Sequence, residues 1–335
     1  MLQGHQTWVF ANKPKIIATG TVVGPFEAQG PLANDFDLLH GDLWLNQPSY
    51  EKAEKKMLEE ACERAIEKAG LQKKDIQFYL SGDLMNQIIS SSFTARTLAV
   101  PYIGLFGACS TSMEGLALGA LLVNSQAARN VLCATASHNA TVEKQFRYPT
   151  EYGSQKPPTA QWTVTGAGAA IVCFEGNGPR ITSATIGRVV DMGISDPFNM
   201  GSAMAPAAVD TITAHFRDLG ITPDEYDLIA TGDLGRVGHH NAKDLLIKHG
   251  IKIPPEILTD CGLLIYREDQ PVFSGGSGCG CSAVVTYGHL LNRMHKGELK
   301  KILVVATGAL LSPLSFQQNE SIPCVAHAVS IEYDH

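Results

Sequence analysis

Cys109 is the residue of this 335-residue chain whose type and setting best suit covalent chemistry. It lies among small residues in GACSTSME (107–114), and the apolar run GLALGALL (115–122) follows directly. This pattern predicts that a helix starts at Cys109, where backbone N–H groups and the helix dipole stabilise a thiolate. Two interpretations are open: Cys109 is a catalytic nucleophile, or it remains from one in a pocket that now holds a ligand.

Two further stretches carry groups suited to binding an anion. SHNATVEKQFRYPTEYG (137–153) contains His138, Asn139 and Arg147. Arg147 could pair with a carboxylate through two parallel hydrogen bonds, and His138 could donate to one near neutral pH. The loop SGGSGCGCS (274–282) contains three serines and four glycines, and glycines let backbone donors approach a ligand. The same glycines would equally permit close packing of two helices.

The elements expected to position these residues alternate between strands and helices. A helix is expected over 50–69, with Ser49 as its N-cap and Gly70 as its end, and another over 207–219. Short apolar or β-branched runs predict strands at 15–23, 76–80, 102–106, 131–136, 168–174, 181–190, 228–231, 261–266, 302–307 and 324–331. This alternation indicates an α/β fold.

The two halves of the chain resemble each other. FYLSGDL (78–84) matches LIATGDL (228–234), and VLCATA (131–136) matches LVVATG (303–308). The matches keep the same order in both halves, which indicates a tandem pair of similar units that meet at a central crevice. Asp83 and Asp233 occupy equivalent places in this repeat, and we expect each to cap the helix that follows.

Composition narrows the classes of function. Charged residues make up 18% of the chain and the net charge is -7, which leaves no basic face for nucleic acid. The apolar runs are shorter than a membrane span and no secretory signal is visible, so we expect a soluble protein. The eight cysteines include a CxC pair at 279–281 without a second pair or a nearby set of histidines, so no metal site is expected.

The chain resembles the thiolase-like superfamily. GACSTSMEGL (107–116) is similar to the nucleophile segment of ketoacyl synthase III-type enzymes, and TGAGAAIVCFE (165–175) is similar to their Gly- and Ala-rich strand entry. The resemblance implies duplicated βαβαβαββ halves, here 1–175 and 176–335, in a five-layered αβαβα core. Thiolase-like proteins commonly pair through the region of 137–153, so a homodimer is expected and that stretch is alternatively a dimer contact.

Longer segments resemble the stage V sporulation protein AD family of spore-forming bacilli. They are HNATVEKQFRYPTEYGSQKP (138–157), DMGISDPFNMGSAMAPAAVDTI (191–212), GGSGCGCSAVVTYGHL (275–290) and VVATGALLSPLSFQQNESIPC (304–324). This resemblance implies a protein that binds dipicolinic acid (pyridine-2,6-dicarboxylate), free or as its calcium chelate, for uptake into the developing spore and release in germination. It implies membrane protein partners from the same operon and peripheral association with the spore inner membrane.

The resemblance to condensing enzymes weakens beyond the cysteine. Those enzymes hold a His and an Asn, or two His, beside the thiolate. The position that matches the His falls at about Gly232, next to Asp233, and the loop that matches the Asn offers Ser and Cys. We therefore expect a non-enzymatic protein without a cofactor; the alternative is a thiolase- or ketoacyl-synthase-like acyltransferase that uses Cys109. His239 and His240 could supply an imidazole, but we expect them in an exposed loop.

The expected ligand contacts gather around Cys109. A flat dicarboxylate needs hydrogen-bond donors, backbone N–H groups and room for a ring. The candidate contacts are Cys109, Ser110, His138, Asn139, Arg147, Ser277 and Cys279. A third interpretation is a docking subunit for membrane proteins in which the pocket is vestigial.

Overall fold

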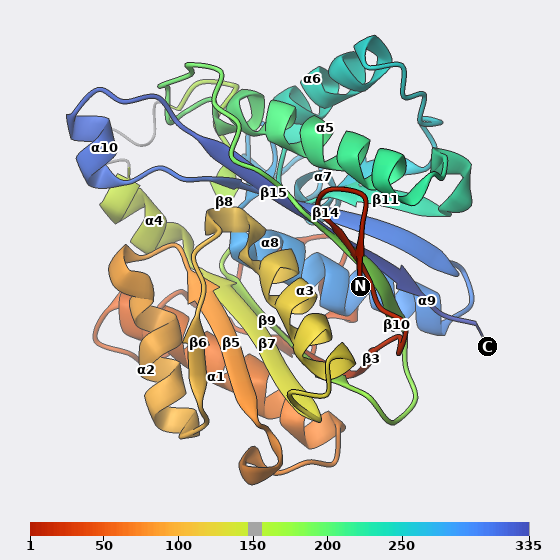
Figure 1. Ribbon diagram of the computed structural model, residues 1–335. Coiled ribbons are helices and arrows are strands. Elements are labelled where there is room, and N and C mark those ends of the chain that lie inside the picture. The colour runs from red at the N-terminus through yellow and green to blue at the C-terminus, as the bar shows by residue number, and fades with distance from the viewer. Residues whose placement is uncertain (147–155, 335) are drawn as a thin grey trace.

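The computed structural model describes residues 1–146 and 156–334, and its central feature is a large mixed sheet (Figure 1). The N-terminal section of this sheet contains β3 (Lys15–Val23), β5 (Phe78–Asp83), β6 (Tyr102–Gly104), β7 (Asn130–Ser137) and β9 (Gly166–Cys173). The C-terminal section contains β10 (Arg180–Ile186), β11 (Leu228–Thr231), β12 (Leu258–Asp260), β14 (Lys301–Ala309) and β15 (Cys324–Glu332). Where β10 meets β3, the paired residues are Arg180 and Lys15.

The two sections have the same topology. The strands lie in the order β12-β11-β14-β15-β10-β3-β9-β7-β5-β6, so each section mirrors the other about the β10–β3 junction. In the N-terminal section β6, β5 and β7 are parallel and β9 and β3 alternate in direction; β12, β11, β14, β15 and β10 repeat this arrangement. The predicted tandem repeat is therefore present in the sheet, and the expected boundary between 175 and 176 falls in the loop from β9 to β10.

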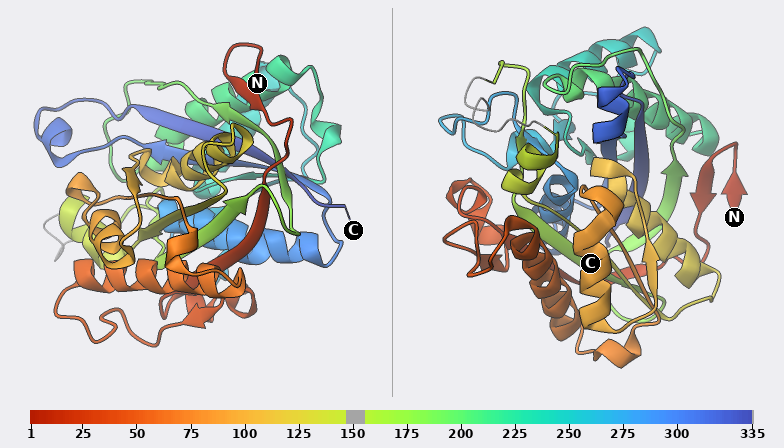
Figure 2. Two further views of the ribbon diagram at one scale, coloured as in Figure 1. Left: turned by 60° about the horizontal axis from the view of Figure 1, so that its bottom comes forward. Right: turned by 90° about the vertical axis from the view of Figure 1, so that its left-hand side faces the viewer.

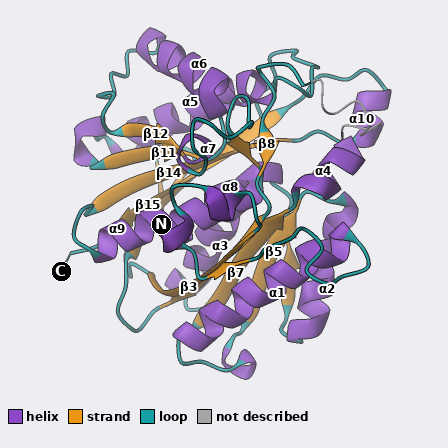
Figure 3. Ribbon diagram, turned by 180° about the vertical axis from the view of Figure 1, so that it is seen from behind, coloured by secondary structure: helices purple, strands orange, loops and turns teal. Residues whose placement is uncertain are grey.

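Helices on both sides of each section complete a five-layered αβαβα core. The helices are α1 (Tyr50–Lys68), α2 (Ile89–Leu98), α3 (Thr111–Asn124), α4 (Asn139–Phe146), α5 (Met200–Leu219), α6 (Gly235–Lys248), α7 (Cys261–Leu264), α8 (Cys279–Val284), α9 (Leu291–His295) and α10 (Pro313–Gln317). α1 and α2 cover one outer face, and α5 and α6 cover the opposite one (Figure 2). α3 and α8 lie between the two sections, as the view from behind also shows (Figure 3). The expected fold is confirmed.

The amino-acid pattern of each helix fits its layer. α1 is amphipathic and buries Ala53, Met57 and Leu58 against the N-terminal section, while its other face carries the charges. α3 lies in the central layer and is apolar on most sides. Gly119 permits its close approach to β7, since a Cβ there would lie 2.5 Å from the Cys133 sulfur.

Several predicted elements need correction. The helix over 50–69 is confirmed, with the Ser49 hydroxyl accepting from the Lys52 N–H. The second helix starts at Met200 rather than 207, because Pro206 lies inside it instead of before it. The apolar run 261–266 is not a strand but begins with α7, and the strand precedes it as β12. His239 and His240 lie on α6 rather than in a loop, and His239 is buried.

The N-terminus pairs with the C-terminal section. β1 (Leu2–Gln3) and β2 (Thr7–Val9) form a hairpin, and β2 pairs antiparallel with β10. The Thr7 hydroxyl and the Gln6 N–H both donate to the Asp218 carboxylate at the end of α5, at 3.1 and 3.0 Å. The remaining short strands are β4 (Leu38–Leu39), beside β3, and the pair β8 (Trp162–Thr163) and β13 (Gly276–Ser277). None of the helices in the described ranges has the length and apolar character needed to cross a bilayer.

Candidate functional site

Cys109 lies in a tight turn at the start of α3, in the centre of the molecule. Ala108 has a left-handed backbone with φ 49°, which is uncommon for a residue with a side chain. The turn lies directly against β14, where Gly308 permits the contact: a Cβ there would lie 2.1 Å from the Gly107 carbonyl oxygen. The N-terminal half thus supplies the cysteine, and the C-terminal half supplies the surface it faces.

A buried carboxyl lies near Cys109: that of Asp233, just beyond the end of β11. Burial raises the pKa of the Cys109 thiol well above its ordinary value, and the neighbouring Asp233 raises it further. The Gly278 N–H lowers this pKa, but burial and Asp233 outweigh it. The position at a helix start therefore does not produce the stabilised thiolate that the sequence suggested.

Asp233 is held by donors from two other elements. Its Oδ1 accepts from the Thr307 hydroxyl of β14 at 2.6 Å, and its Oδ2 accepts from the Gly278 N–H at 2.9 Å and the Ser277 hydroxyl at 3.3 Å. Gly278 has φ 98°, a backbone conformation that favours glycine and that presents its N–H to the site. Burial nevertheless raises the pKa of Asp233.

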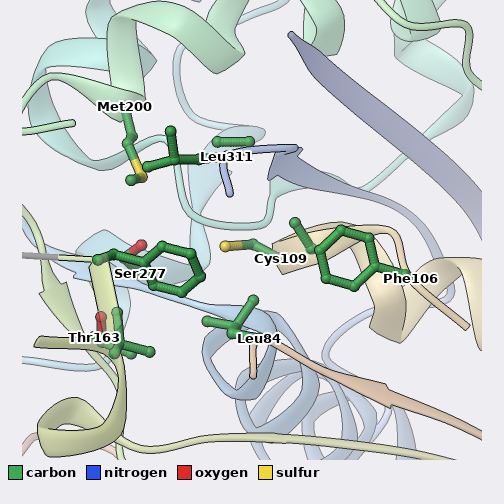
Figure 4. A pocket seen from close by; sticks show the side chains of 11 residues that line it. Leu84, Phe106, Cys109, Thr163, Met200, Ser277 and Leu311 are labelled. Carbon is green, nitrogen blue, oxygen red and sulfur yellow. The ribbon is translucent and has the colours of Figure 1, made fainter. Parts of the chain in front are cut away.

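A small cavity adjoins Cys109. Its volume is about 30 Å³, room for about two water molecules. The Cys109 sulfur points into it between Met200 and Leu311 on one side and Leu84 on the other, with Ser277 across from it (Figure 4). We call this space the inner cavity. Its lining is Leu84, Phe106, Ala108, Cys109, Val142, Phe146, Thr163, Met200, Ser277, Ala309 and Leu311.

A larger cavity lies next to the inner one and shares part of its wall. Its volume is about 270 Å³, and we call it the outer cavity. Leu84, Phe106, Phe146 and Leu311 line both spaces. The remaining lining is Met85, Asn86, Gln87, Ile88, Gly104, Leu105, Gln145 and Ser312, which brings amide and hydroxyl groups beside two aromatic rings.

The predicted ligand contacts fall into two groups. Cys109 and Ser277 line the inner cavity. Cys279 packs beside Cys109 with its thiol donating to the Ala136 carbonyl at 3.0 Å, and Asn139 donates to the carbonyl of Thr163, a lining residue, at 3.4 Å.

Two predicted contacts face away from both cavities, and one cannot be placed. The Ser110 hydroxyl donates to the Gly107 carbonyl at 2.6 Å. The His138 Nε2–H donates to the Leu43 carbonyl at 3.0 Å, and its Nδ1 accepts from the Ala140 N–H. Arg147 lies outside the described residues.

The capping prediction holds for Asp83 and is wrong for Asp233. Asp83 accepts the Ser91 N–H in the first turn of α2 at 2.7 Å. The start of α6 is instead capped by Asp260, which accepts the Leu234 and Gly235 N–H groups at 2.8 and 3.0 Å. Asp233 therefore does not cap α6, and its carboxylate accepts from Thr307, Gly278 and Ser277 near Cys109.

Sequence reasoning missed Asp233 as a partner of Cys109 and missed the apolar lining from Met200 and Leu311. For Asp233 a signal exists: the strands after each repeated SGD or TGD segment end in Gly104 in one half and Asp260 in the other. Because the C-terminal half has a second acid at this place, one acid can cap the following helix and the other is available for a different contact. The lining residues carry no such signal, since they are ordinary apolar residues far apart in the chain.

Comparisons with known proteins agree on both family and fold. The family described as Stage V sporulation protein AD (SpoVAD) matches residues 4–332. Stage V sporulation protein AD of Bacillus subtilis (strain 168) is 52% identical over 331 residues, which cover 99% of this chain and 98% of that protein. Among solved structures, 3-oxoacyl-[acyl-carrier-protein] synthase III from Aquifex aeolicus VF5 is 16% identical with a TM-score of 0.59, covering 96% of this chain and 100% of its own. Human mitochondrial 3-ketoacyl-CoA thiolase is 12% identical with a TM-score of 0.61, covering 97% and 100%. The fold is thiolase-like.

Proposed function

Since the chain belongs to the stage V sporulation protein AD family, we propose that it acts in sporulation as a non-catalytic protein that binds dipicolinate beside Cys109. The observation that carries the non-catalytic part is that Cys109 is buried, at 6% exposed, and that the charged group near it is the buried carboxyl of Asp233 rather than an imidazole, which raises the pKa of the thiol. Thioester chemistry needs a thiolate with a positively polarised partner. An acid in that place keeps the proton on sulfur, so the cysteine serves as a neutral part of the wall of the inner cavity.

The outer cavity is the better fit for the ring of dipicolinate. The inner cavity, at about 30 Å³, is too small for an aromatic dicarboxylate, and the nearby Asp233 would repel one. The outer cavity, at about 270 Å³, approaches the size of small-molecule sites. Phe106 and Phe146 can stack on a flat ring, and the amides of Asn86 and Gln145 can donate to its carboxylates.

The wider role includes partners that the resemblance implies. We propose that the ligand arrives as free dipicolinate or as its calcium chelate, that the protein works with membrane proteins of the same operon at the spore inner membrane, and that it forms a homodimer. In this role it takes part in dipicolinate uptake during spore formation and in release during germination.

An acyltransferase that uses Cys109 is the second candidate. The observation in its favour is the left-handed Ala108 immediately before the cysteine, since strained backbone is frequent at reacting groups. For this function, either Asp233 or another group must take the thiol proton when a thioester arrives. The two candidates differ in one measurable product, a covalent acyl group on Cys109.

The test is calorimetric titration with dipicolinate, with and without calcium, beside mass spectrometry of the protein after incubation with acetyl-CoA. We expect saturable binding and no acyl group. Phe106→Ala should weaken binding by about tenfold because it removes a ring-stacking surface. Phe174→Ala is the matched control, since Phe174 is similarly exposed, at 45% against 51%, but lines neither cavity.

Two results would overturn the proposal. An acyl group on Cys109 that is lost in Cys109→Ala would establish the acyltransferase. Absence of any heat of dipicolinate binding would reject the ligand. Cys109→Ala should itself bind dipicolinate within about tenfold of the wild type, because Cys109 lines the inner cavity and not the outer cavity that holds the ring, and even one lost neutral contact costs only about 0.5–1.5 kcal/mol.

A further inference from the structure

A strained segment forms one wall of the outer cavity. Gln87 and Ile88 lie side by side between β5 and α2, and both have left-handed backbones, with φ 54° and 48°. Ile88 is β-branched, and a positive φ for such a residue is a genuine outlier. Two consecutive residues of this kind persist only where surrounding contacts impose the conformation, and such strain is concentrated at switch regions.

Asp83 imposes the conformation from one side. Its Oδ1 accepts from the Met85 N–H at 2.9 Å, and its Oδ2 accepts from the Ser91 N–H and Ser91 hydroxyl, both at 2.7 Å. These bonds join the residues before the strained pair to those after it. Because the hydrogen bonds are buried and directed at a carboxylate, they are among the stronger contacts available to a loop.

α4 holds the segment from the other side. The Gln145 side chain donates to the Leu84 carbonyl at 3.1 Å and accepts from the Asn86 N–H at 3.1 Å. Leu84 lines both cavities, so the same residues that fix the strained pair also fix the wall between the cavities. Gly104 makes room for Ile88, since a Cβ there would lie 2.7 Å from the Ile88 Cδ1.

A second buried acid, Glu54, lies near Asp83, and the two carboxyls influence each other's protonation. Glu54 of α1 is buried; its Oε2 accepts from the Thr141 hydroxyl at 2.7 Å, and its Oε1 has no hydrogen-bond partner in the described part of the chain. Burial and the neighbouring Asp83 raise the pKa of Glu54. Burial also raises the pKa of Asp83, to about 6, but its three donors favour the charged form, so at neutral pH Asp83 carries the negative charge and Glu54 takes the proton.

We propose that residues 84–88 are a gate between the outer cavity and Cys109, and that Asp83 is the positioning residue that holds this gate closed. Releasing the Asp83 hydrogen bonds lets Gln87 and Ile88 leave the left-handed region. Leu84 then moves with them and the two cavities join. The gate controls access to Cys109 for any small molecule. It can therefore be tested with a thiol reagent, and the result does not depend on whether the protein binds dipicolinate.

The rate at which iodoacetamide alkylates Cys109, followed by peptide mass spectrometry, measures the opening of the gate. All eight cysteines are buried, so Cys62 on α1 serves as an internal reference for global unfolding. Asp83→Asn should raise the ratio of Cys109 to Cys62 alkylation by about tenfold, because a charged acceptor of buried donors is lost. Glu54→Gln, a neutral mimic of the protonated acid, should leave the ratio unchanged.

Substitutions at exposed Gln87 test the strain without touching the buried acids. Gln87→Gly should lower the alkylation ratio by about threefold, because glycine accepts the left-handed backbone without strain. Gln87→Val should raise the ratio by about fivefold, because a β-branched residue resists it. Equal ratios for the two Gln87 variants, or an Asp83→Asn ratio equal to that of the wild type, would overturn the gate. An Asp83→Asn effect matched by Glu54→Gln would overturn the assignment to Asp83.

Discussion

Asp83 and Asp233 occupy the same place in the two halves of this protein and do different work. Asp83, at the end of β5, accepts the backbone of the segment that follows it. Asp233, just after β11, does not cap its helix, which Asp260 does instead; its carboxylate accepts from Thr307 and Gly278 in the centre of the molecule, near Cys109. The strand registers explain the division: Ser81 pairs with Gly104 in β6, whereas its counterpart Thr231 pairs with Asp260 in β12. In the C-terminal half Asp260 caps the helix, so Asp233 does not have to. In the N-terminal half Gly104 stands in the place of Asp260, and the space beside this glycine accommodates the Ile88 side chain.

The largest expected effect comes from Asp260, the acid that the N-terminal half lacks. Burial raises its pKa from an ordinary 3.8 to about 7. The native state therefore holds this proton more tightly than the unfolded state, so the stabilisation is complete below about pH 4 and is lost as the pH rises to about 7. Relative to Asp260→Asn, the wild type should lose about 4 kcal/mol of unfolding free energy across that range.

Urea unfolding at a series of pH values measures this difference. Asp244→Asn, on the exposed face of α6, is the control and should follow the wild type. Parallel plots of unfolding free energy against pH for the wild type and Asp260→Asn would mean that Asp260 does not titrate in this range. That result would contradict the prediction that burial of Asp260 raises its pKa.

The second largest effect concerns Asp83, whose half of the chain has no second acid at the place of Asp260. Asp83→Asn should lower the free energy of unfolding at neutral pH by about 3 kcal/mol, because buried donors from Met85 and Ser91 lose a charged acceptor. Asp233→Asn should cost less, about 1 kcal/mol, because only one backbone N–H, that of Gly278, donates to Asp233, and its other donors are hydroxyls that can rotate to other acceptors. Urea unfolding measures both losses. Equal losses in the two variants would contradict the claim that Asp83 stabilises the fold more than Asp233 does.

The smallest effect is on the cysteine itself. In Asp233→Asn the negative charge beside Cys109 is gone, and the pKa of the thiol should fall by about one unit, equivalent to about 1.4 kcal/mol. The pH dependence of Cys109 alkylation reports this shift, with Cys109→Ala giving the background. Asp83→Asn should change the rate of alkylation but not this pKa, so a lowered pKa in that variant would contradict the separate roles.

The sequence predicts the layers of this fold better than its site. Buried strands such as 15–23 and 131–136 stand out as apolar runs, and the repeat identifies equivalent strands in the two halves. The run 261–266 was assigned wrongly because a short apolar segment has no period that separates strand from helix. Asp233 was assigned wrongly because capping depends on a neighbour, Asp260, that only the strand register brings close.

The outer cavity could not be predicted at all. Its wall depends on left-handed conformations at Gln87 and Ile88, and neither residue type signals them. Long-range contacts with α4 and with Gly104 impose these angles, so the local sequence is a poor guide there. That Cys109 and Ser277 lie at one cavity could be expected from the sequence, because small residues near helix starts do carry a sequence signature.

The N-terminal hairpin has a consequence for the order of assembly. Residues 7–9 pair with β10, and Thr7 contacts Asp218, more than two hundred positions later in the chain. During synthesis residues 7–9 leave the ribosome before their partners and must therefore wait until β10 and α5 have emerged. Attachment of this hairpin is a late step in maturation, and it ties an early segment of the chain to its second half.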